Sequence, residues 1–278
     1  MSTLTVKEAK SLRFTSMDVD PQATPGFKGD KAAIERNAEK VDAELRELQE
    51  KLYANARSGD NPGSVLIVLQ GMDTSGKGGV VKHTLDPLDP QGVHIASFGK
   101  PTEEELAHDF LWRVEKQLPA QGKIGIFDRS HYEDVIVHGV HQLSSPEEIE
   151  RRYGAINDFE ARLVKSGTRV IKVFLHISRK FQKENLLERL ENPEKYWKYN
   201  PGDVDERARW DDYMEAYRIA FERTDTDAAP WYIVPSDNKP YARLVVKMLL
   251  LDALRSMNLD WPAPDFDVVR ELERVKNS

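Results

Sequence analysis

Short apolar runs alternate along the chain with amphipathic stretches in which apolar residues recur every three or four positions. The runs are rich in β-branched residues, which is typical of strands that are buried on both faces. We predict strands at 64–70, 93–98, 124–127, 170–177 and 231–234. Helices are predicted at 31–55, 77–85, 103–118, 146–166, 180–191, 205–224, 241–257 and 265–276. Strands that alternate with helices indicate an α/β fold with a parallel central sheet covered on both faces.

The beginning of the chain shows little periodicity and holds several prolines and glycines, so we expect an irregular arm at 1–30 that can still pack on the body. The helix at 31–55 has one apolar face, which favours packing within the chain but would also suit a seam between two copies. The sequence contains no internal repeat and no linker long enough to divide it. We therefore expect 1–278 to be a single domain.

Composition narrows the classes of function. The chain has no cysteine, which excludes disulfides, thiolate metal sites and a cysteine nucleophile. Its net charge of -7 argues against non-specific binding to nucleic acid, so an anionic ligand must be held by a local basic site. No apolar run approaches the length of a membrane span, and the first residues lack the apolar stretch of a signal peptide. We expect a cytoplasmic protein that binds neither nucleic acid nor membranes.

A glycine-rich segment follows the first predicted strand directly. It reads Gly71-Met72-Asp73-Thr74-Ser75-Gly76-Lys77-Gly78-Gly79. The pattern G-x-x-x-x-G-K between a buried strand and a helix is the setting of a phosphate-binding loop, in which backbone N–H groups and the helix N-terminus hold a phosphate. Lys77 would then reach the group being transferred. A glycine-rich turn without a ligand is the alternative interpretation.

Two residues of this loop depart from an ordinary nucleoside-triphosphatase loop. Gly78 stands where such loops carry the Ser or Thr whose hydroxyl binds Mg²⁺. Asp73 places a carboxylate where phosphates approach, which is tolerable only if a cation or a proton-donating group faces it. We therefore predict that Asp73 binds a metal ion or orients the nucleophile. Capping of the following helix is the structural alternative.

A second candidate site lies at the end of the strand at 124–127, an edge where open α/β sheets bind ligands. Asp128 suits a Walker-B acid that holds Mg²⁺, and Arg129 suits neutralisation of the charge on a transferred phosphoryl group. A surface ion pair is the alternative for these two residues. His131 is predicted either to contact phosphate or to be a hydrogen-bonded structural histidine.

The segment 179–210 mixes basic, acidic and aromatic side chains around two Asn-Pro pairs, which predicts a helix-loop-helix. Such a segment can act as a lid that excludes water and brings an arginine to the transferred group. A solvated pair of charged helices is the alternative. Further along, Asn238 and Lys239 follow the strand at 231–234 and would either hold a nucleotide or cap the next helix.

Several blocks in this order resemble polyphosphate kinase family 2. They are GMDTSGKGG at 71–79, SFGKPTEEELAHDFLWR at 97–113, FDRSHYEDV at 127–135, ERLENPEKYWKY at 188–199 and APWYIVPSDNKPYAR at 229–243. The resemblance spans about 30–262 and implies a three-layer α/β/α P-loop kinase fold of the thymidylate-kinase type with a helical lid. It also implies reversible, Mg²⁺-dependent, in-line phosphoryl transfer between inorganic polyphosphate and a nucleoside mono- or diphosphate, without a phosphohistidine.

Residue by residue, the family's loop aspartate and lysine correspond to Asp73 and Lys77, its Walker-B pair to Asp128 and Arg129, and its lid arginine to Arg189. Asp73 and Asp128 are then expected to share the metal ion, with Mn²⁺ able to replace Mg²⁺. Polyphosphate requires a basic channel above the loop. The candidates for this channel are Lys82, Arg113, Lys116, Arg129 and His131.

The block at 97–113 looks most like family members that act on both AMP and ADP, so adenine nucleotides are the expected acceptors and guanine nucleotides are further candidates. The family association suggests a homo-oligomer, either a dimer or a tetramer. An ATP-dependent nucleoside monophosphate kinase is the main alternative, and Gly78 argues against it. A non-catalytic protein that binds nucleotide or polyphosphate is the second alternative, which the joint presence of Asp73, Lys77, Asp128 and Arg129 disfavours.

Overall fold

The computed structural model describes residues 3–278 and contains a five-stranded sheet in which all neighbouring strands are parallel. The strand order is β2-β3-β1-β4-β5. The strands are β1 (Ser64–Gln70), β2 (Val93–Ser97), β3 (Ile124–Asp128), β4 (Thr168–His176) and β5 (Trp231–Pro235). Each lies within two residues of its predicted ends, so the parallel α/β prediction is confirmed.

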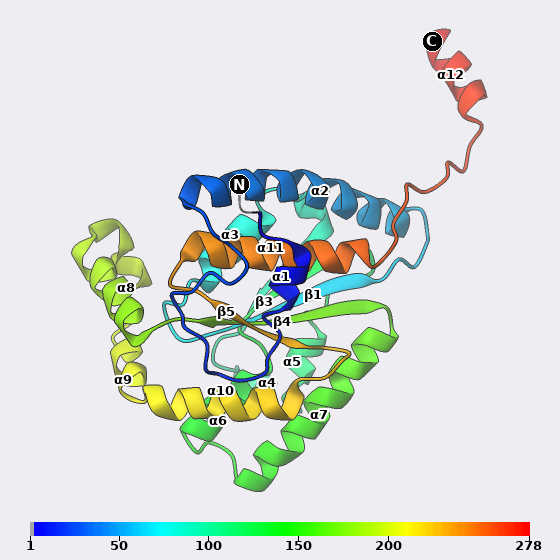
Figure 1. Ribbon diagram of the computed structural model, residues 1–278. Coiled ribbons are helices and arrows are strands. Elements are labelled where there is room, and N and C mark those ends of the chain that lie inside the picture. Colours follow the sequence, from blue (N-terminus) through cyan, green and yellow to red (C-terminus); the bar gives the residue numbers. More distant parts are fainter. Residues whose placement is uncertain (1–2) are drawn as a thin grey trace.

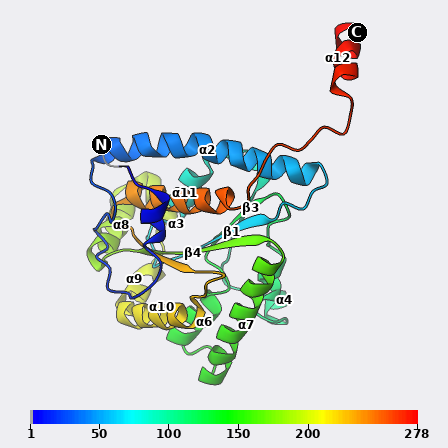
Figure 2. The ribbon, with the colours of Figure 1, turned by 45° about the vertical axis from the view of Figure 1, so that its right-hand side comes forward.

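Helices cover both faces of the sheet and complete three layers (Figure 1). One face carries α2 (Lys31–Arg57), α3 (Lys77–Leu85) and α11 (Lys239–Arg255). The other face carries α6 (Glu133–Val140), α7 (Pro146–Lys165) and α10 (Trp210–Thr224). The turned view in Figure 2 keeps α2 and α11 on one side of the strands and α7 and α10 on the other.

Strand β1 lies in the middle of the sheet and is buried along its whole length. Successive side chains of a strand point to opposite faces, so Ile67 packs into the core beside α2 and α11, whereas Val68 packs into the core beside α7 and α10. The apolar face of α2 is occupied within the chain, because Val41, Leu45 and Leu52 are buried in the same core as α11. Packing within the chain is therefore the correct interpretation of this helix.

The prediction of one helix at 103–118 is wrong. This segment forms two short helices, α4 (Glu103–Leu106) and α5 (Trp112–Glu115). Between them the Asp109 carboxylate accepts a hydrogen bond from the Leu111 N–H over 3.0 Å, and a side chain that binds the backbone in this way favours a turn over a helix. Periodicity overlooks the break because no proline or glycine marks it.

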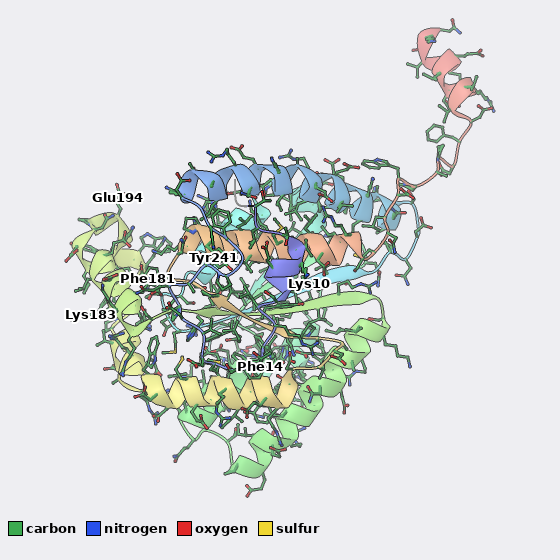
Figure 3. All side chains as sticks on the ribbon, in the orientation of Figure 1. Lys10, Phe14, Phe181, Lys183, Glu194 and Tyr241 are labelled. Carbon is green, nitrogen blue, oxygen red and sulfur yellow. The ribbon has the colours of Figure 1, made fainter. Side chains whose placement is uncertain are left out.

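The segment at 179–210 consists of α8 (Arg179–Glu191), a 3₁₀ helix (Pro193–Lys198) and α9 (Gly202–Ala208). It lies at one end of the sheet, where α8 projects from the body (Figure 1). Figure 3 shows Lys183 and Glu194 on its outer side, and both are exposed. The helix predicted at 205–224 is divided, since α10 begins directly after Arg209.

The N-terminal arm is more regular than predicted. Residues 1–2 lie outside the described part of the chain. A short helix, α1 (Val6–Lys10), begins with a capping box. The chain then runs beside the edge strand β5, where the Phe14 N–H donates to the Trp231 carbonyl over 2.8 Å. The arm therefore packs on the body through backbone hydrogen bonds as well as side chains.

Two further short helices are α6, in the middle of the chain, and α12, near its C-terminus. The sequence did not predict α6, because its eight residues offer barely two turns of periodicity. The helix α12 (Val268–Lys276) extends away from the body (Figure 1), and none of its residues is buried. Within residues 3–278, no helix is both long enough and apolar enough to cross a membrane.

Candidate active site at the carboxyl edge of the sheet

The glycine-rich segment after β1 forms a tight loop that leads into α3. Gly71 has a φ of 151°, and a Cβ there would lie 2.7 Å from Ser75 Oγ and 2.9 Å from the Leu175 carbonyl oxygen. Gly76 is the N-cap of α3 in the left-handed conformation, with a φ of 99°. Both positions therefore need glycine, the first for close approach and the second for its backbone conformation. The loop ends at a helix N-terminus, where free N–H groups favour an anion.

Lys77, the first residue of α3, folds back over this loop. Its Nζ donates to the carbonyl oxygens of Gly71, at 2.6 Å, and Met72, at 3.3 Å. Burial lowers the pKa of Lys77, against the opposing effect of the Asp73 carboxylate. A phosphate oxygen is a stronger partner for an ammonium group than two neutral carbonyls are. Lys77 is thus positioned to exchange these contacts for an anion in the loop.

The two predicted acids, Asp73 and Asp128, lie at the ends of neighbouring strands, with Asp73 in the loop after β1. Asp128 ends β3, which pairs with β1 so that Asp128 lies opposite Leu69. Arg129 follows, and its Nη2 donates to Asp73 Oδ1 over 2.8 Å. Arg129 has a φ of 65°, a left-handed conformation that costs a residue other than glycine about 1 kcal/mol or more. Its surroundings must therefore hold it there.

Glu133, at the start of α6, is a third carboxylate near Arg129. Its Oε2 lies 3.9 Å from Arg129 Nη1. Burial lowers the pKa of Arg129, but the Glu133 and Asp73 carboxylates outweigh this and raise it above its ordinary value. Burial also raises the pKa of Glu133, although Arg129 opposes that shift. The guanidinium is consequently held between two acidic side chains.

A cavity of about 640 Å³ opens above the loop, between α3, α11 and residues 179–210, here named the lid segment. The predicted site residues that line it are Asp73, Thr74, Ser75, Gly76, Lys77, Gly78, Gly79, Lys82, Asp128, Arg129, Arg189 and Lys239. Further basic residues also line it, namely His83, Lys195, Lys198 and Arg243. The cavity is therefore rich in positive charge although the chain as a whole is acidic.

Arg243 is the clearest site residue that sequence reasoning overlooked. It follows Lys239 by one helical turn on α11, so both side chains lie on one helix face. A Cβ on Gly79 would lie 3.2 Å from Arg243 Nη2, which places the guanidinium directly against the phosphate loop. The spacing of the two basic residues was a readable signal, but only the fold brings α11 beside this loop.

The lid segment contacts the loop through two side-chain amides. Gln182 Nε2 donates to the Asp73 carbonyl at 3.1 Å, and Asn185 Nδ2 donates to the Thr74 carbonyl at 3.2 Å. Lys239 Nζ in turn donates to Asn185 Oδ1 over 2.9 Å. The first turns of α8 are therefore tied both to the loop and to the start of α11.

Arg189 lies farther along α8 and lines the cavity. Its Nη1 donates to the Lys198 carbonyl at 2.7 Å and to Asp203 Oδ2 at 3.1 Å. These contacts hold the guanidinium within the lid segment. A bound phosphate chain would compete with Asp203 for it, because a charge-assisted bond to phosphate can replace one to a carboxylate.

Asp73 and Asp128 line the same cavity, as shared binding of one cation requires. Within residues 3–278, no three His, Cys, Asp or Glu side chains gather as a metal-binding group. One or two carboxylates together with phosphate and water oxygens are the ligands that Mg²⁺ usually takes in phosphotransferases. The residues present therefore fit a metal ion bound jointly with phosphate rather than one held by protein ligands alone.

Two of the residues proposed for the basic channel point elsewhere. Arg113 is buried, with Nη2 at 3.3 Å from Asp134 Oδ2 and Nη1 donating to the Gly99 carbonyl at 2.9 Å. Lys116 Nζ lies over the Trp112 ring, 3.2 Å from its centroid. Neither lines the cavity above the loop. Both side chains have local partners that the sequence pattern does not reveal.

His131 and Asn238 likewise have structural contacts. His131 is fully buried, and its Nε2 lies 3.4 Å from Glu160 Oε1. The Asn238 side chain caps α11 by accepting a hydrogen bond from the Tyr241 N–H at 3.2 Å. Both residues therefore make the structural contacts that were the alternative interpretation of each.

A smaller cavity of about 230 Å³ adjoins the same loop. Asp73 and Arg129 line both cavities, so their ion pair stands at the boundary between them. The smaller cavity is also lined by Gly71, Met72, Val137, Glu133, Glu206, Tyr213 and Tyr217. It is acidic and aromatic, in contrast to the basic cavity on the other side.

These features define a class of protein. The chain has a parallel sheet between two layers of helices, a glycine-rich loop between β1 and α3, and an acid at the end of β3. This combination is the P-loop kinase fold. The family model of polyphosphate kinase 2 matches residues 28–262, and the chain belongs to that family.

The relatives agree with this assignment. The chain is 43% identical to an AMP/ADP-polyphosphate phosphotransferase of Meiothermus ruber, covering 91% of this chain and 93% of the relative. It is 40% identical to an ADP-polyphosphate phosphotransferase of Rhodopseudomonas palustris, covering 78% of each. A crystal structure of polyphosphate kinase 2 from Arthrobacter aurescens superposes with a TM-score of 0.95 at 52% identity, covering 100% of this chain and 99% of that one.

Proposed function

We propose that this chain transfers the terminal phosphoryl group of inorganic polyphosphate to AMP or ADP by direct, reversible, in-line attack. The observation that carries the proposal is a cavity lined by basic residues above the phosphate loop, with Asp73 and Asp128 both facing it. Membership of the polyphosphate kinase 2 family supports the same reaction class. The names of the relatives from Meiothermus ruber and Rhodopseudomonas palustris support the choice of donor and acceptors.

In this proposal the donor chain lies across the basic cavity. The loop N–H groups and Lys77 hold the phosphate nearest the reaction, while Lys82 and Arg243 bind phosphates farther along the chain. Lys239 ties the lid segment to α11 through Asn185. A local concentration of cations explains how a protein with a net charge of -7 binds a polyanion.

The transfer step depends on positioning and charge neutralisation, because phosphoryl transfer needs little covalent help from the protein. Arg129 and Arg189 stabilise negative charge on the transferred group, and Lys77 bridges it to the donor. Asp73 and Asp128 would hold Mg²⁺, for which Mn²⁺ can substitute; when bound, this ion neutralises phosphate oxygens and orients them. The lid excludes water, which would otherwise hydrolyse the donor.

The alternative function, an ATP-dependent nucleoside monophosphate kinase, is disfavoured by the relatives named above, which use polyphosphate. Ordinary loops of that kind bind the metal through a Ser or Thr hydroxyl directly after the lysine. This chain has Gly78 there, and a Cβ at Gly78 would meet no atom within 4 Å, so space alone does not impose glycine. The metal role is assigned to Asp73 instead, which favours polyphosphate as the donor.

The test is a matrix of donors and acceptors. Purified protein with Mg²⁺ is incubated with long-chain polyphosphate and AMP, ADP, GMP or GDP, without any other phosphoryl source. We expect ADP and then ATP from AMP, and ATP from ADP, with the Lys77→Ala variant as the control for contaminating kinases. If polyphosphate yields no nucleotide product while ATP and AMP yield ADP, the proposal is wrong and the alternative holds.

A further inference from the structure

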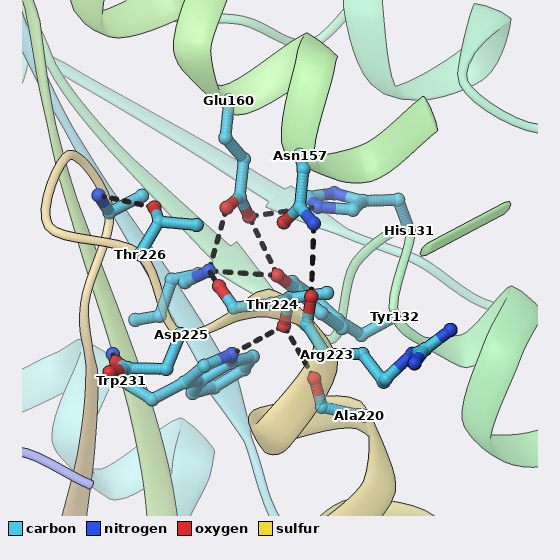
Figure 4. A network of polar contacts seen from close by, with 12 residues as sticks. His131, Tyr132, Asn157, Glu160, Ala220, Arg223, Thr224, Asp225, Thr226 and Trp231 are labelled. Carbon is cyan, nitrogen blue, oxygen red and sulfur yellow. Dashed lines mark hydrogen bonds and ion pairs between the residues drawn. The ribbon is translucent and has the colours of Figure 1, made fainter. Parts of the chain in front are cut away.

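A network of charged and polar side chains is buried between the sheet and the helices α7 and α10 (Figure 4). It joins Tyr132, which follows Arg129 by three residues, to Glu160 of α7 and Lys172 of β4. These three side chains are at most 1% exposed. None of them lines either cavity of the site, so none can contact the substrates of the proposed transfer there.

Lys172 uses all its donors in this network. Its Nζ donates to Glu160 Oε2 at 2.6 Å, to Tyr132 Oη at 2.9 Å and to the Thr224 carbonyl, the last of α10, at 2.7 Å. An ammonium group has three protons, so no donor is left unpaired. The Tyr132 hydroxyl in turn donates to Glu160 Oε1 at 2.8 Å. His131, which comes directly before Tyr132 in the chain, also contacts Glu160, with Nε2 3.4 Å from Oε1.

The contact with Lys172 favours the ionised form of the Glu160 carboxyl. Burial raises the pKa of Glu160, but the Lys172 ammonium outweighs this and leaves the carboxyl pKa below its ordinary value. A buried ion pair is rarely the most stable filling for a core, because apolar side chains of the same volume avoid the cost of desolvation. Stability alone thus does not explain why Lys172 and Glu160 are buried here, so their network is expected to have a further role.

What the network holds is the short turn between β3 and α6. The Tyr132 ring is also packed edge-on against Trp231, with centroids 4.7 Å apart. On the other side of the turn, Ser130 Oγ accepts hydrogen bonds from Gln70 Nε2 and from the Tyr132 N–H, both at 3.2 Å. The turn is consequently anchored both at Ser130 and at Tyr132. Arg129, with its left-handed backbone, lies just before these anchors.

We propose that the Tyr132–Glu160–Lys172 network is a positioning device for phosphoryl transfer, which holds Arg129 in the conformation that directs its guanidinium to the transferred group. Tyr132, Glu160 and Lys172 are positioning residues, because they touch neither cavity and act through the backbone of 129–132. The inference rests on the proposed role of Arg129. It adds that this role depends on residues buried behind the site.

The variant to use is Tyr132→Phe, which removes one hydroxyl and keeps the ring. Lys172→Met would leave Glu160 buried without its counter-charge and is expected to unfold the protein.

The matched control is Tyr153→Phe, since Tyr153 is a buried tyrosine of α7 whose hydroxyl has no hydrogen bond to any of residues 3–278. We expect Tyr132→Phe to lower kcat by about tenfold, with KM for polyphosphate within about twofold, because small misplacements of a catalytic group reduce turnover steeply. Tyr153→Phe should change neither.

A double-mutant cycle distinguishes positioning from general weakening. In an Arg129→Ala background, we expect Tyr132→Phe to lower kcat by less than about twofold, because the group it positions is already gone. An equal loss in both backgrounds, or no loss from Tyr132→Phe alone, overturns the proposal while leaving the proposed function intact. Absence of any transfer from polyphosphate by the unaltered protein would instead overturn the proposed function and this inference with it.

Hydrogen exchange provides a readout that needs no turnover. Amides of 129–134 should exchange faster in Tyr132→Phe than in Tyr153→Phe, because only the first releases the turn. Exchange that is the same in both variants contradicts the anchoring on which the positioning role depends, whatever the reaction catalysed.

Discussion

Arg129 donates a hydrogen bond to Asp73 over 2.8 Å and so joins the turn after β3 to the phosphate loop after β1. The carboxylate is one of the two that we propose to hold the metal ion, and the guanidinium is proposed to bind the transferred phosphoryl group. In this structure the two side chains pair with each other. Binding of metal and phosphate must therefore replace this ion pair with two new interactions.

Arg129→Ala should tighten Mn²⁺ binding in the absence of phosphate, because Asp73 no longer has a competing partner. Partly exposed ion pairs contribute up to about 1 kcal/mol, so we expect a gain of about fivefold in affinity by calorimetric titration. The same variant should lose about 100-fold in kcat. Arg218→Ala, which breaks an exposed ion pair on α10, is the control and should leave both values unchanged. Unaltered Mn²⁺ affinity in Arg129→Ala would contradict a metal role for Asp73.

Lys77→Ala and Asp128→Asn should each lower kcat by at least ~100-fold while the fold is kept, because each removes charge stabilisation of the transition state. Steady-state kinetics and circular dichroism check the two parts of this expectation. Asp60→Asn, in the exposed turn before β1, serves as a control for loss of one carboxylate. A loss below tenfold would remove the residue concerned from the catalytic set.

Arg243→Ala should raise KM for polyphosphate by about tenfold with kcat changed less than about twofold, because this residue is assigned to binding along the donor chain and not to the transferred group. The matched control is Arg255→Ala on the same helix, whose guanidinium pairs with Glu44 at 2.6 Å, away from the cavity. A change in kcat without a change in KM would place Arg243 at the reacting phosphate instead.

The glycines of the phosphate loop should respond differently to a methyl group. Gly71→Ala should lose nearly all activity, because its Cβ would lie 2.9 Å from the Leu175 carbonyl oxygen in a backbone conformation that disfavours other residues. Gly78→Ala should retain activity within about threefold, since nothing lies within 4 Å of a Cβ there. Gly78→Ser restores the hydroxyl that ordinary loops carry at this position. We expect this variant still to use polyphosphate, and not ATP, as its donor. Equal effects at Gly71 and Gly78 would show that steric approach is not what selects glycine.

Acid should weaken the fold through His176, a half-buried histidine of β4. Burial lowers the pKa of His176 from its ordinary value of 6.5, so the unfolded chain takes up a proton at a pH where the folded chain does not. The stability contributed by neutral His176 is therefore complete above about pH 6.5 and declines as pH falls below it. Tm measured at pH 7.5 and 5.5 should fall less for His176→Gln than for the unaltered chain. His94→Gln, at the more exposed edge strand, is the control, and an identical fall in the two variants would contradict the assignment.

The local elements were readable from the sequence because their causes are local. Buried strands such as β1 appear as continuous β-branched runs, and the phosphate loop combines glycines and Lys77 at a fixed spacing between a strand and a helix. A hydrogen bond from a side chain to the nearby backbone, such as that of Asp109, leaves no comparable signal. A helix of only two turns, such as α6, leaves none either. These are where the predicted elements failed.

The site depended on contacts between segments that are distant in sequence. Arg113 was predicted to line the basic channel, and His131 was predicted either to contact phosphate or to be structural. The buried carboxylates of Asp134 and Glu160 pair with them instead, and neither lines the cavity. Arg243 reaches the phosphate loop only because α11 packs beside α3. Sequence by itself determined the strands, the loop and the acid at the end of β3, since each is encoded by adjacent residues. Which charges face the cavity was decided by the tertiary structure alone, because the partner that pairs with or releases each charge lies elsewhere in the chain.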